Sequence, residues 1–199
     1  MTETKARRTK PGIHVDAADR WWFGPNQIVN PDVLKYFKAN LRRDREGEEY
    51  YIVNRFGELL EHASLDRVSG FPLIVETVLV STGTNAGGET IPTLDLRLDS
   101  RQNISVPADG LTVYDEHTLG ILLPERLVPA RLGPLAMASL ADFLDISEGD
   151  GENESPAEAE YRLMIPAGDA ETSSENQSWL DIKHGERDQL FAEASASDD

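Results

Sequence analysis

Residues 21–53, WWFGPNQIVNPDVLKYFKANLRRDREGEEYYIV, predict a strand, a turn, a capped helix, a second turn and a second strand. Asn30 is a preferred N-cap residue, Pro31 suits the first helical position, and Asp32 complements the positive end of the helix dipole. Apolar residues then recur at helical spacing, at Val33, Leu34, Phe37 and Leu41. The helix is expected to cover a sheet with this stripe, while its cations, at Lys35, Lys38 and Arg42, fall away from it.

Strand signals dominate the chain that follows. Tyr50–Val53, Glu58–Leu65, Phe71–Val80, Ile91–Asp99, Asn103–Val106, Leu111–Tyr114 and Leu119–Leu123 are the expected strands. Phe71–Val80 is the most apolar run and is expected to be central, and Ile91–Asp99 alternates as a half-buried strand does. A second helix is expected from Gly133 and Pro134 to Asp145, with Ala136, Leu140, Phe143 and Leu144 buried. Short turns between consecutive strands predict an α+β fold: a mostly antiparallel sheet with two helices, an order that allows two related strand-helix motifs.

The charge is distributed unevenly along the chain. The formal net charge of −17 divides into +2 over residues 1–20, −7 over residues 21–145 and −12 over residues 146–199. We therefore expect a flexible basic arm (1–20), an α+β domain (21–145) and an acidic, largely disordered tail (146–199) with short apolar patches. These patches are Tyr161–Ile165 and the group Trp179, Leu180, Ile182, Leu190 and Phe191. Docking on the chain's own domain and a motif for a protein partner both remain open.

Composition also excludes several classes of function. The acidic charge argues against binding along a nucleic-acid backbone, and the absence of cysteine removes disulfides and thiolate chemistry. No run approaches the roughly 20 apolar residues of a membrane span, and residues 1–14 lack the apolar core of a secretory signal. A cytoplasmic location is the expectation, and no cofactor is predicted. The acidic tail could bind a basic protein partner.

The pattern over residues 21–145 resembles a bacterial family known as domain of unknown function 1285. The likeness rests first on Trp22 and Gly24, the first helix, Gly47 before Tyr51, and Glu58. A second set consists of the polar strand LDLRLDSRQN and the segment LVPARLGPLAMASLADFL, which contains Arg131. The threonine-proline-glutamate step of that family is replaced here by residues 54–58, NRFGE, and its acidic turn by Ser69-Gly70. The resemblance implies an α+β fold with two related motifs and a signalling or ligand-binding role.

Candidate binding residues follow from residue type. Trp22, Tyr36 and Tyr51 could line a ligand pocket, although aromatic residues near a helix start also pack in cores. Arg97, in the polar strand, and Arg131, before the closing helix, complete the set of ligand-binding candidates.

One group of residues could ligate a metal. Glu58, Glu61 and His62 supply two carboxylates and an imidazole within five positions. An HExxH pattern is absent, and on a strand Glu61 points away from the other two, so solvated edge charges are the alternative.

Enzyme signatures are absent from the sequence. The Gly-rich segment 81–90 lacks the P-loop lysine and reads as a hairpin loop, and no serine lies in a GxSxG elbow. We therefore predict a non-enzymatic module that binds a small ligand or a protein. One alternative is an enzyme with scattered carboxylates, which would show a pocket holding at least two of Glu58, Glu61, His62, Asp95 and His117. The other is an acidic-tail protein that binds a basic partner.

Overall fold

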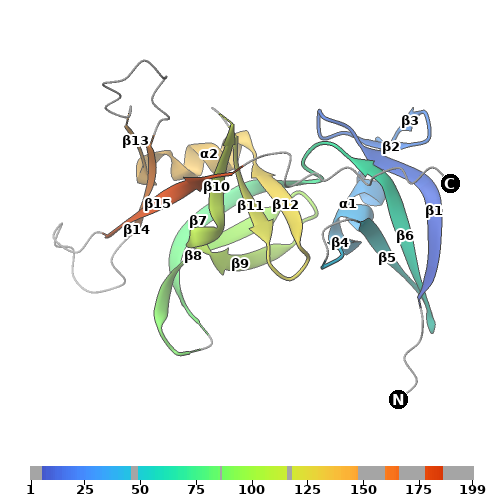
Figure 1. Cartoon of the computed structure of the whole chain (residues 1–199), viewed down its shortest axis with the longest axis horizontal. Coiled ribbons are helices and arrows are strands. Elements are labelled where there is room, and N and C mark those ends of the chain that lie inside the picture. The colour runs from blue at the N-terminus through green and yellow to red at the C-terminus, as the bar shows by residue number, and fades with distance from the viewer. Residues whose placement is uncertain are drawn as a thin grey trace.

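The structure, a computed structural model, describes residues 6–45, 49–85, 87–115, 118–147, 160–165 and 178–185. Within these ranges the protein is mostly β, with two sheets and two short α-helices (Figure 1). The predicted α+β class is therefore wrong. The helices were anticipated, but additional strands form where an arm, a loop and a tail were expected. The sheets are also mixed rather than antiparallel, because β1 runs parallel to β6, β10 to β15, and β12 to β7.

The first sheet has six strands in the order β3-β2-β1-β6-β5-β4. Its strands are β1 (Arg7–Val15), β2 (Trp21–Phe23), β3 (Asn26–Gln27), β4 (Leu41–Arg43), β5 (Tyr50–Phe56) and β6 (Leu59–Val68). The strand β1 was expected to be part of a flexible arm. Instead, Ile13 and Val15 alternate along it and are buried, and the strand lies between β2 and β6.

The helix α1 (Pro31–Asn40) packs against the first sheet, and its start confirms the sequence signals. The Asn30 side chain accepts hydrogen bonds from the backbone N–H groups of Asp32, at 3.0 Å, and Val33, at 3.2 Å. Leu34 and Phe37 pack on the core as predicted. Val33 is exposed, however, and Lys38 is buried, so the placement of Lys38 in water was wrong.

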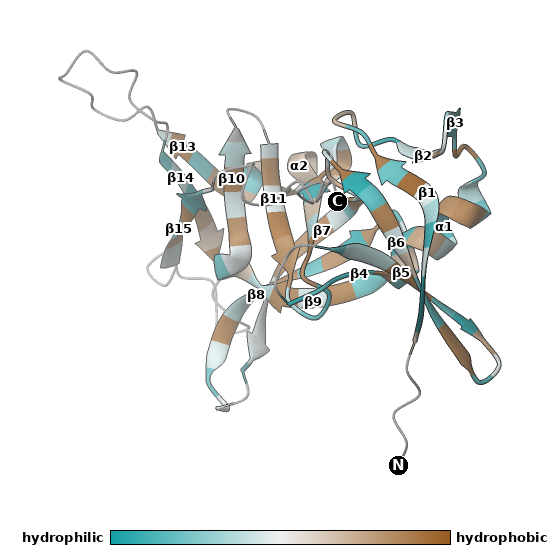
Figure 2. Cartoon of the chain, turned by 45° about the vertical axis from the view of Figure 1, so that its right-hand side comes forward, coloured by the Kyte–Doolittle hydropathy of each residue, from teal (hydrophilic) through white to brown (hydrophobic). Residues whose placement is uncertain are grey.

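The second sheet has nine strands in the order β13-β14-β15-β10-β11-β12-β7-β8-β9. Its strands are β7 (Leu73–Thr84), β8 (Thr90–Leu98), β9 (Asn103–Pro107), β10 (Leu111–Asp115), β11 (Thr118–Leu123), β12 (Val128–Leu132), β13 (Leu144–Ser147), β14 (Glu160–Ile165) and β15 (Ser178–His184). The predicted alternation in β8 is confirmed, with Leu94, Leu96 and Leu98 buried. Figure 2 shows this alternation of hydrophobic and hydrophilic residues along strands of the sheet. The Gly-rich segment forms the β7–β8 hairpin, as predicted.

The helix α2 (Pro134–Leu140) is shorter than predicted. It buries Ala136 and Leu140 against the second sheet, and then a 3₁₀ turn over Ala141–Phe143 leads into β13. The residues of β13 pair with β14 and so continue the sheet rather than the helix. A second 3₁₀ turn, Ala108–Gly110, joins β9 to β10. No helix in the described ranges combines the length and the apolar character that crossing a bilayer requires.

Polar contacts join the two sheets where they meet. The Trp21 indole N–H donates to the Pro72 carbonyl at 3.2 Å, and Lys38 on α1 forms an ion pair with Asp99, at the end of β8. The Asp99 carboxylate also accepts from the backbone N–H of Ile74 at 3.2 Å. These contacts fix the first sheet and its helix against the second sheet, which contains the hollows described next.

Candidate functional site

The strand β9 lies between two hollows in the surface of the second sheet. The first, which we call the edge hollow, has a volume of about 450 Å³ and lies between β9 and the β11–β12 turn. Its lining residues are Asn103, Ile104, Ser105, Val106, Leu123, Pro124, Glu125 and Arg126. The wall combines apolar side chains with polar ones, and Glu125 and Arg126 add one charge of each sign. A hollow of a few hundred Å³ that joins apolar contact with a few placed polar groups is typical of small-ligand sites.

Arg126 is held in place by the backbone of its turn. Its N–H donates to the Leu123 carbonyl at 3.2 Å, and its own carbonyl accepts from the N–H of Arg43 in β4 at 2.9 Å. The next residue, Leu127, has a φ of 56°, a left-handed conformation that is costly for a residue with a side chain. The turn thus keeps a strained residue beside the arginine, and such strain is concentrated at functional sites in proteins.

The guanidinium of Arg126 is buried without a full set of partners. The residue is 8% exposed, and its Nη1 atom has no hydrogen-bond partner in the described part of the chain. Burial lowers the pKa of Arg126, the charge of Arg42 lowers it further, and Glu125 acts in the opposite direction. A buried donor without an acceptor costs about 1–3 kcal/mol, and more when it is charged. An anion bound beside this guanidinium would remove that cost.

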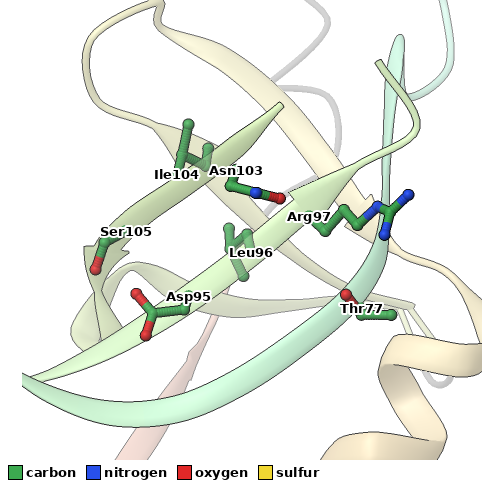
Figure 3. Close-up of a pocket in the computed structure, with 7 residues that line it drawn as sticks. All are labelled: Thr77, Asp95, Leu96, Arg97, Asn103, Ile104 and Ser105. Atoms are coloured by element: carbon green, nitrogen blue, oxygen red, sulfur yellow. The ribbon is translucent and has the colours of Figure 1, made fainter. Parts of the chain in front are cut away.

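The second hollow, which we call the face hollow, lies on the outer surface of the sheet and has a volume of about 470 Å³. It is lined by Thr77, Asp95, Leu96, Arg97, Asn103, Ile104 and Ser105 (Figure 3). Arg97, a predicted ligand-binding residue, thus borders a hollow, although its guanidinium also forms a 3.6 Å ion pair with Glu76. Asp95 accepts a hydrogen bond from Ser81 at 2.9 Å. The two hollows share Asn103, Ile104 and Ser105.

None of the predicted aromatic residues lines either hollow. Trp22 stacks on His14 with ring centroids 6.2 Å apart, and its indole N–H donates to Asp16 at 2.9 Å. Tyr36 lies on the exposed side of α1. Tyr51 in β5 stacks on His62 in β6 at 4.5 Å. The contacts of Trp22 and Tyr51 thus join neighbouring strands and a turn of the first sheet.

Asp16 organises the turn before Trp22. Burial raises the pKa of its carboxyl group, but hydrogen bonds from the backbone of Arg20, the side chains of Trp22 and Arg20, and the backbone of Ala18 outweigh burial and leave the pKa at about 2.

Arg131, another predicted ligand-binding residue, pairs with Asp19. Asp19 also accepts from the backbone N–H of Phe71 at 2.6 Å, so one carboxylate joins the turn before β2 to the start of the second sheet. Gly70 fits against this turn closely: a Cβ there would lie 2.3 Å from the Asp16 carbonyl oxygen. Arg131 thus takes part, through Asp19, in the junction between the two sheets, and its role in ligand binding stays a prediction.

The predicted metal ligands lie around the β5–β6 hairpin. Glu58 is in the turn, and Glu61 and His62 are successive residues of β6, whose side chains point to opposite faces. Glu61 accepts from Asn54 at 3.4 Å, and burial and the charge of Arg8 lower the pKa of His62, with Glu49 acting in the opposite direction. Among the described residues, no three His, Asp or Glu side chains are grouped so that they could hold a metal ion.

The apolar patches of the tail extend the second sheet. Leu180 and Ile182 in β15 pack on the core, whereas Trp179 is half exposed with the guanidinium of Arg162 5.7 Å from its ring centre. Leu190 and Phe191 lie outside the described residues. Trp179 is therefore the exposed member of the predicted partner motif among the described residues.

The sequence did not point to Arg126. It stands in the segment Pro124-Glu125-Arg126, which reads as a polar turn between apolar strands. The one available signal was the position of Arg126 between the apolar segments that form β11 and β12. That position does not show whether an arginine in the turn is exposed or buried. Of the four described acid–base candidates, Asp95 alone lines one of these two hollows, and His117 lies outside the described residues.

The fold has a counterpart among solved structures. A crystal structure of a DUF1285 family protein from Silicibacter pomeroyi DSS-3 is similar, with a TM-score of 0.50, 15% sequence identity, and coverage of 73% of this chain and 76% of the other. No protein-family model matches the sequence, and no curated protein matches it. The resemblance to this family that the sequence suggested is thus confirmed at the level of the fold. At this identity the similarity shows the fold alone, and the function is argued from the site.

Proposed function

We propose that this protein binds a ligand bearing a carboxylate or phosphate group in the edge hollow, without transforming it. The observation that carries the proposal is Arg126, a residue that lines the hollow, is 8% exposed and has a buried Nη1 atom without a partner in the described chain. Protein interiors rarely leave a charged donor in this state unless a water, an ion or a ligand completes it.

The chemistry of the hollow suits an anion attached to an apolar body. Guanidinium groups bind carboxylate and phosphate through two parallel hydrogen bonds, and these bonds gain strength where water is excluded. The Asn103 amide and the Ser105 hydroxyl add neutral polar groups, and Ile104 and Leu123 add apolar contact. The positive charge of Arg42 near Arg126 favours an anion further, and the carboxylate of Glu125 acts in the opposite direction.

A binding role without catalysis fits the groups around the hollow. Its lining includes one carboxylate, Glu125, and no histidine, so a second group for proton transfer is missing from the described wall. The proposal extends to a cytoplasmic protein that senses its ligand, as the composition and the family resemblance suggest. Its partner is then a small molecule or a protein rather than a nucleic acid.

The test is a pair of measurements on Arg126→Met. Wild-type protein is titrated with inorganic phosphate and with succinate, and thermal unfolding and calorimetry report binding. A ligand at 100 times its Kd stabilises the folded state by about 2.7 kcal/mol. The variant is expected to lose this stabilisation, and without ligand it should be at least as stable as wild type, because an apolar side chain replaces a buried, incompletely paired charge.

Arg97→Gln, in the face hollow, is the matched control and should keep the response to the anions. The proposal is overturned if neither anion stabilises the wild type, or if Arg126→Met is destabilised by more than about 2 kcal/mol in the absence of ligand. The latter would mean that the guanidinium is a structural element of the core.

A further inference from the structure

The strand β9 is the last strand of the second sheet, so one of its edges has no neighbouring strand among the described residues. Its other edge pairs with β8 in an antiparallel register in which Leu96 faces Ile104 and Asp95 faces Ser105. An exposed edge presents backbone N–H and C=O groups that another chain can pair with. Which residues present them follows from the register.

The outward-facing backbone groups of β9 belong to Asn103 and Ser105. In an antiparallel ladder, pairs that exchange hydrogen bonds alternate with pairs that do not. The Leu98 N–H donates to the Gln102 carbonyl at 2.9 Å, which makes that pair a bonded one. Counting along the register, Ile104 and Val106 bond to β8, whereas Asn103 and Ser105 direct their backbone groups away from it.

Pro107 agrees with this assignment. It faces Thr93, and by the same alternation this is a pair that exchanges no hydrogen bonds. A proline there removes no ladder hydrogen bond, which is the position in which strands tolerate it.

The edge hollow lies where a further strand would run. Asn103 and Ser105 line it from β9, and Leu123 and Arg126 line it from the opposite side. The β11–β12 turn borders the same hollow, whose volume of about 450 Å³ is of the size that a small ligand or a short segment occupies. The strand that carries the free backbone groups and Arg126 therefore border the same hollow.

We propose that the ligand of the edge hollow is an extended peptide that adds a strand to β9 and places a carboxylate on Arg126. This inference rests on the proposed anion site and names its ligand class. Pairing with Asn103 and Ser105 supplies up to four backbone hydrogen bonds, and Arg126 supplies the charge complementarity. Strand addition to a sheet edge is an established mode of peptide recognition in which backbone bonds give affinity and alternate side chains give specificity.

The probe is a fluorescein-labelled hexapeptide of alternating valine and threonine with a free C-terminal carboxylate, measured by fluorescence anisotropy with the full chain. Amidation of the C-terminus is expected to weaken binding about tenfold or more, because a charge-assisted hydrogen bond is lost. Two further peptides carry N-methyl groups at odd or at even positions. Only one of these two should lose binding, because an added strand uses alternate N–H groups.

Three protein variants separate this inference from the anion site. Ser105→Pro removes an outward N–H without breaking the ladder, whereas Ser105→Ala removes only the hydroxyl and keeps that N–H. The peptide should therefore bind Ser105→Pro about tenfold or more weakly than Ser105→Ala, while succinate should stabilise these two variants equally. Arg126→Met should lose both peptide binding and stabilisation by succinate. Thermal unfolding checks that each variant is folded.

Stabilisation by succinate without peptide binding, or equal binding of both N-methylated peptides, would overturn strand addition and leave the anion site standing. Failure of succinate and peptide together would overturn both. A dimer in sedimentation velocity that Ser105→Pro abolishes would assign the edge to a second copy of the chain and would also overturn the peptide.

Discussion

Replacing Lys38 with methionine is expected to destabilise the protein by about 2–3 kcal/mol. The side chains of Lys38 and Asp99 are 11% and 16% exposed, so the ion pair between α1 and the end of β8 is largely withdrawn from water. Breaking a buried pair by removing one partner costs about 3–5 kcal/mol, because the other charge stays buried and unpaired. Residual exposure and the hydrogen bond from the Ile74 N–H to Asp99 reduce that figure here.

The double variant Lys38→Met with Asp99→Asn should recover most of this loss and lie within about 1 kcal/mol of wild type, because no charge is then left unpaired. Urea unfolding, followed by both tryptophan fluorescence and circular dichroism, gives the free energies and tests whether the two sheets unfold together. Lys35→Met, on the same helix, is the matched control. Lys35 forms no ion pair with any described residue, so its loss should change stability by less than about 0.5 kcal/mol.

The reasoning is refuted if Lys38→Met is as stable as Lys35→Met, or if the double variant loses the sum of the two single losses. Either result would mean that the Lys38–Asp99 ion pair contributes no interaction energy between α1 and the second sheet.

Three further predictions concern the turns. The lowered pKa of Asp16 gives a stability contribution that is present above its ordinary value of 3.8 and is lost as pH falls toward about 2, so urea midpoints of wild type and Asp16→Asn should converge over that window. Gly70→Ala should cost about 2–3 kcal/mol, measured by the same unfolding, because the new Cβ meets backbone of the Asp16 turn; a loss under about 0.5 kcal/mol would contradict the packing. Leu127→Gly should be more stable than Leu127→Ala by about 1 kcal/mol, since both remove the side chain and only glycine adopts the left-handed φ of 56° freely; equal stabilities would mean that the turn is unstrained.

Local signals predicted local structure well. Asn30 and Pro31 marked the start of α1, and the alternation around Leu96 identified β8 and its buried face. Both signals act within a few residues of the chain, which is the range over which capping and side-chain periodicity operate.

Contacts between distant segments were not predictable in the same way. The parallel partner of β1 begins at Leu59, and that of β15 begins at Leu111, so the pairing that places each strand inside its sheet is not visible in the local sequence. Lys38 read as solvent-facing because its carboxylate partner lies 61 residues away. The α+β prediction failed for the same reason, since parallel strand pairs require long connections that sequence periodicity does not report.

The candidate site was predicted in part. Arg97 and Asp95 do border a hollow, but Trp22, Tyr36 and Tyr51 do not. A buried arginine without full partners is a property of three-dimensional packing, and no spacing rule in one sequence identifies it.

The order of the strands has a consequence for synthesis on the ribosome. The first sheet needs residues 7–68 only, whereas the second sheet gains β15 beside β10 only after residue 184 has been made. The nascent chain can therefore complete its first sheet while the second still exposes the strand edge that β15 will cover. We expect pulling force on stalled chains to rise once when residue 68 has left the ribosomal tunnel and again only when residue 184 has left it, and a single late rise would show that the two sheets form together.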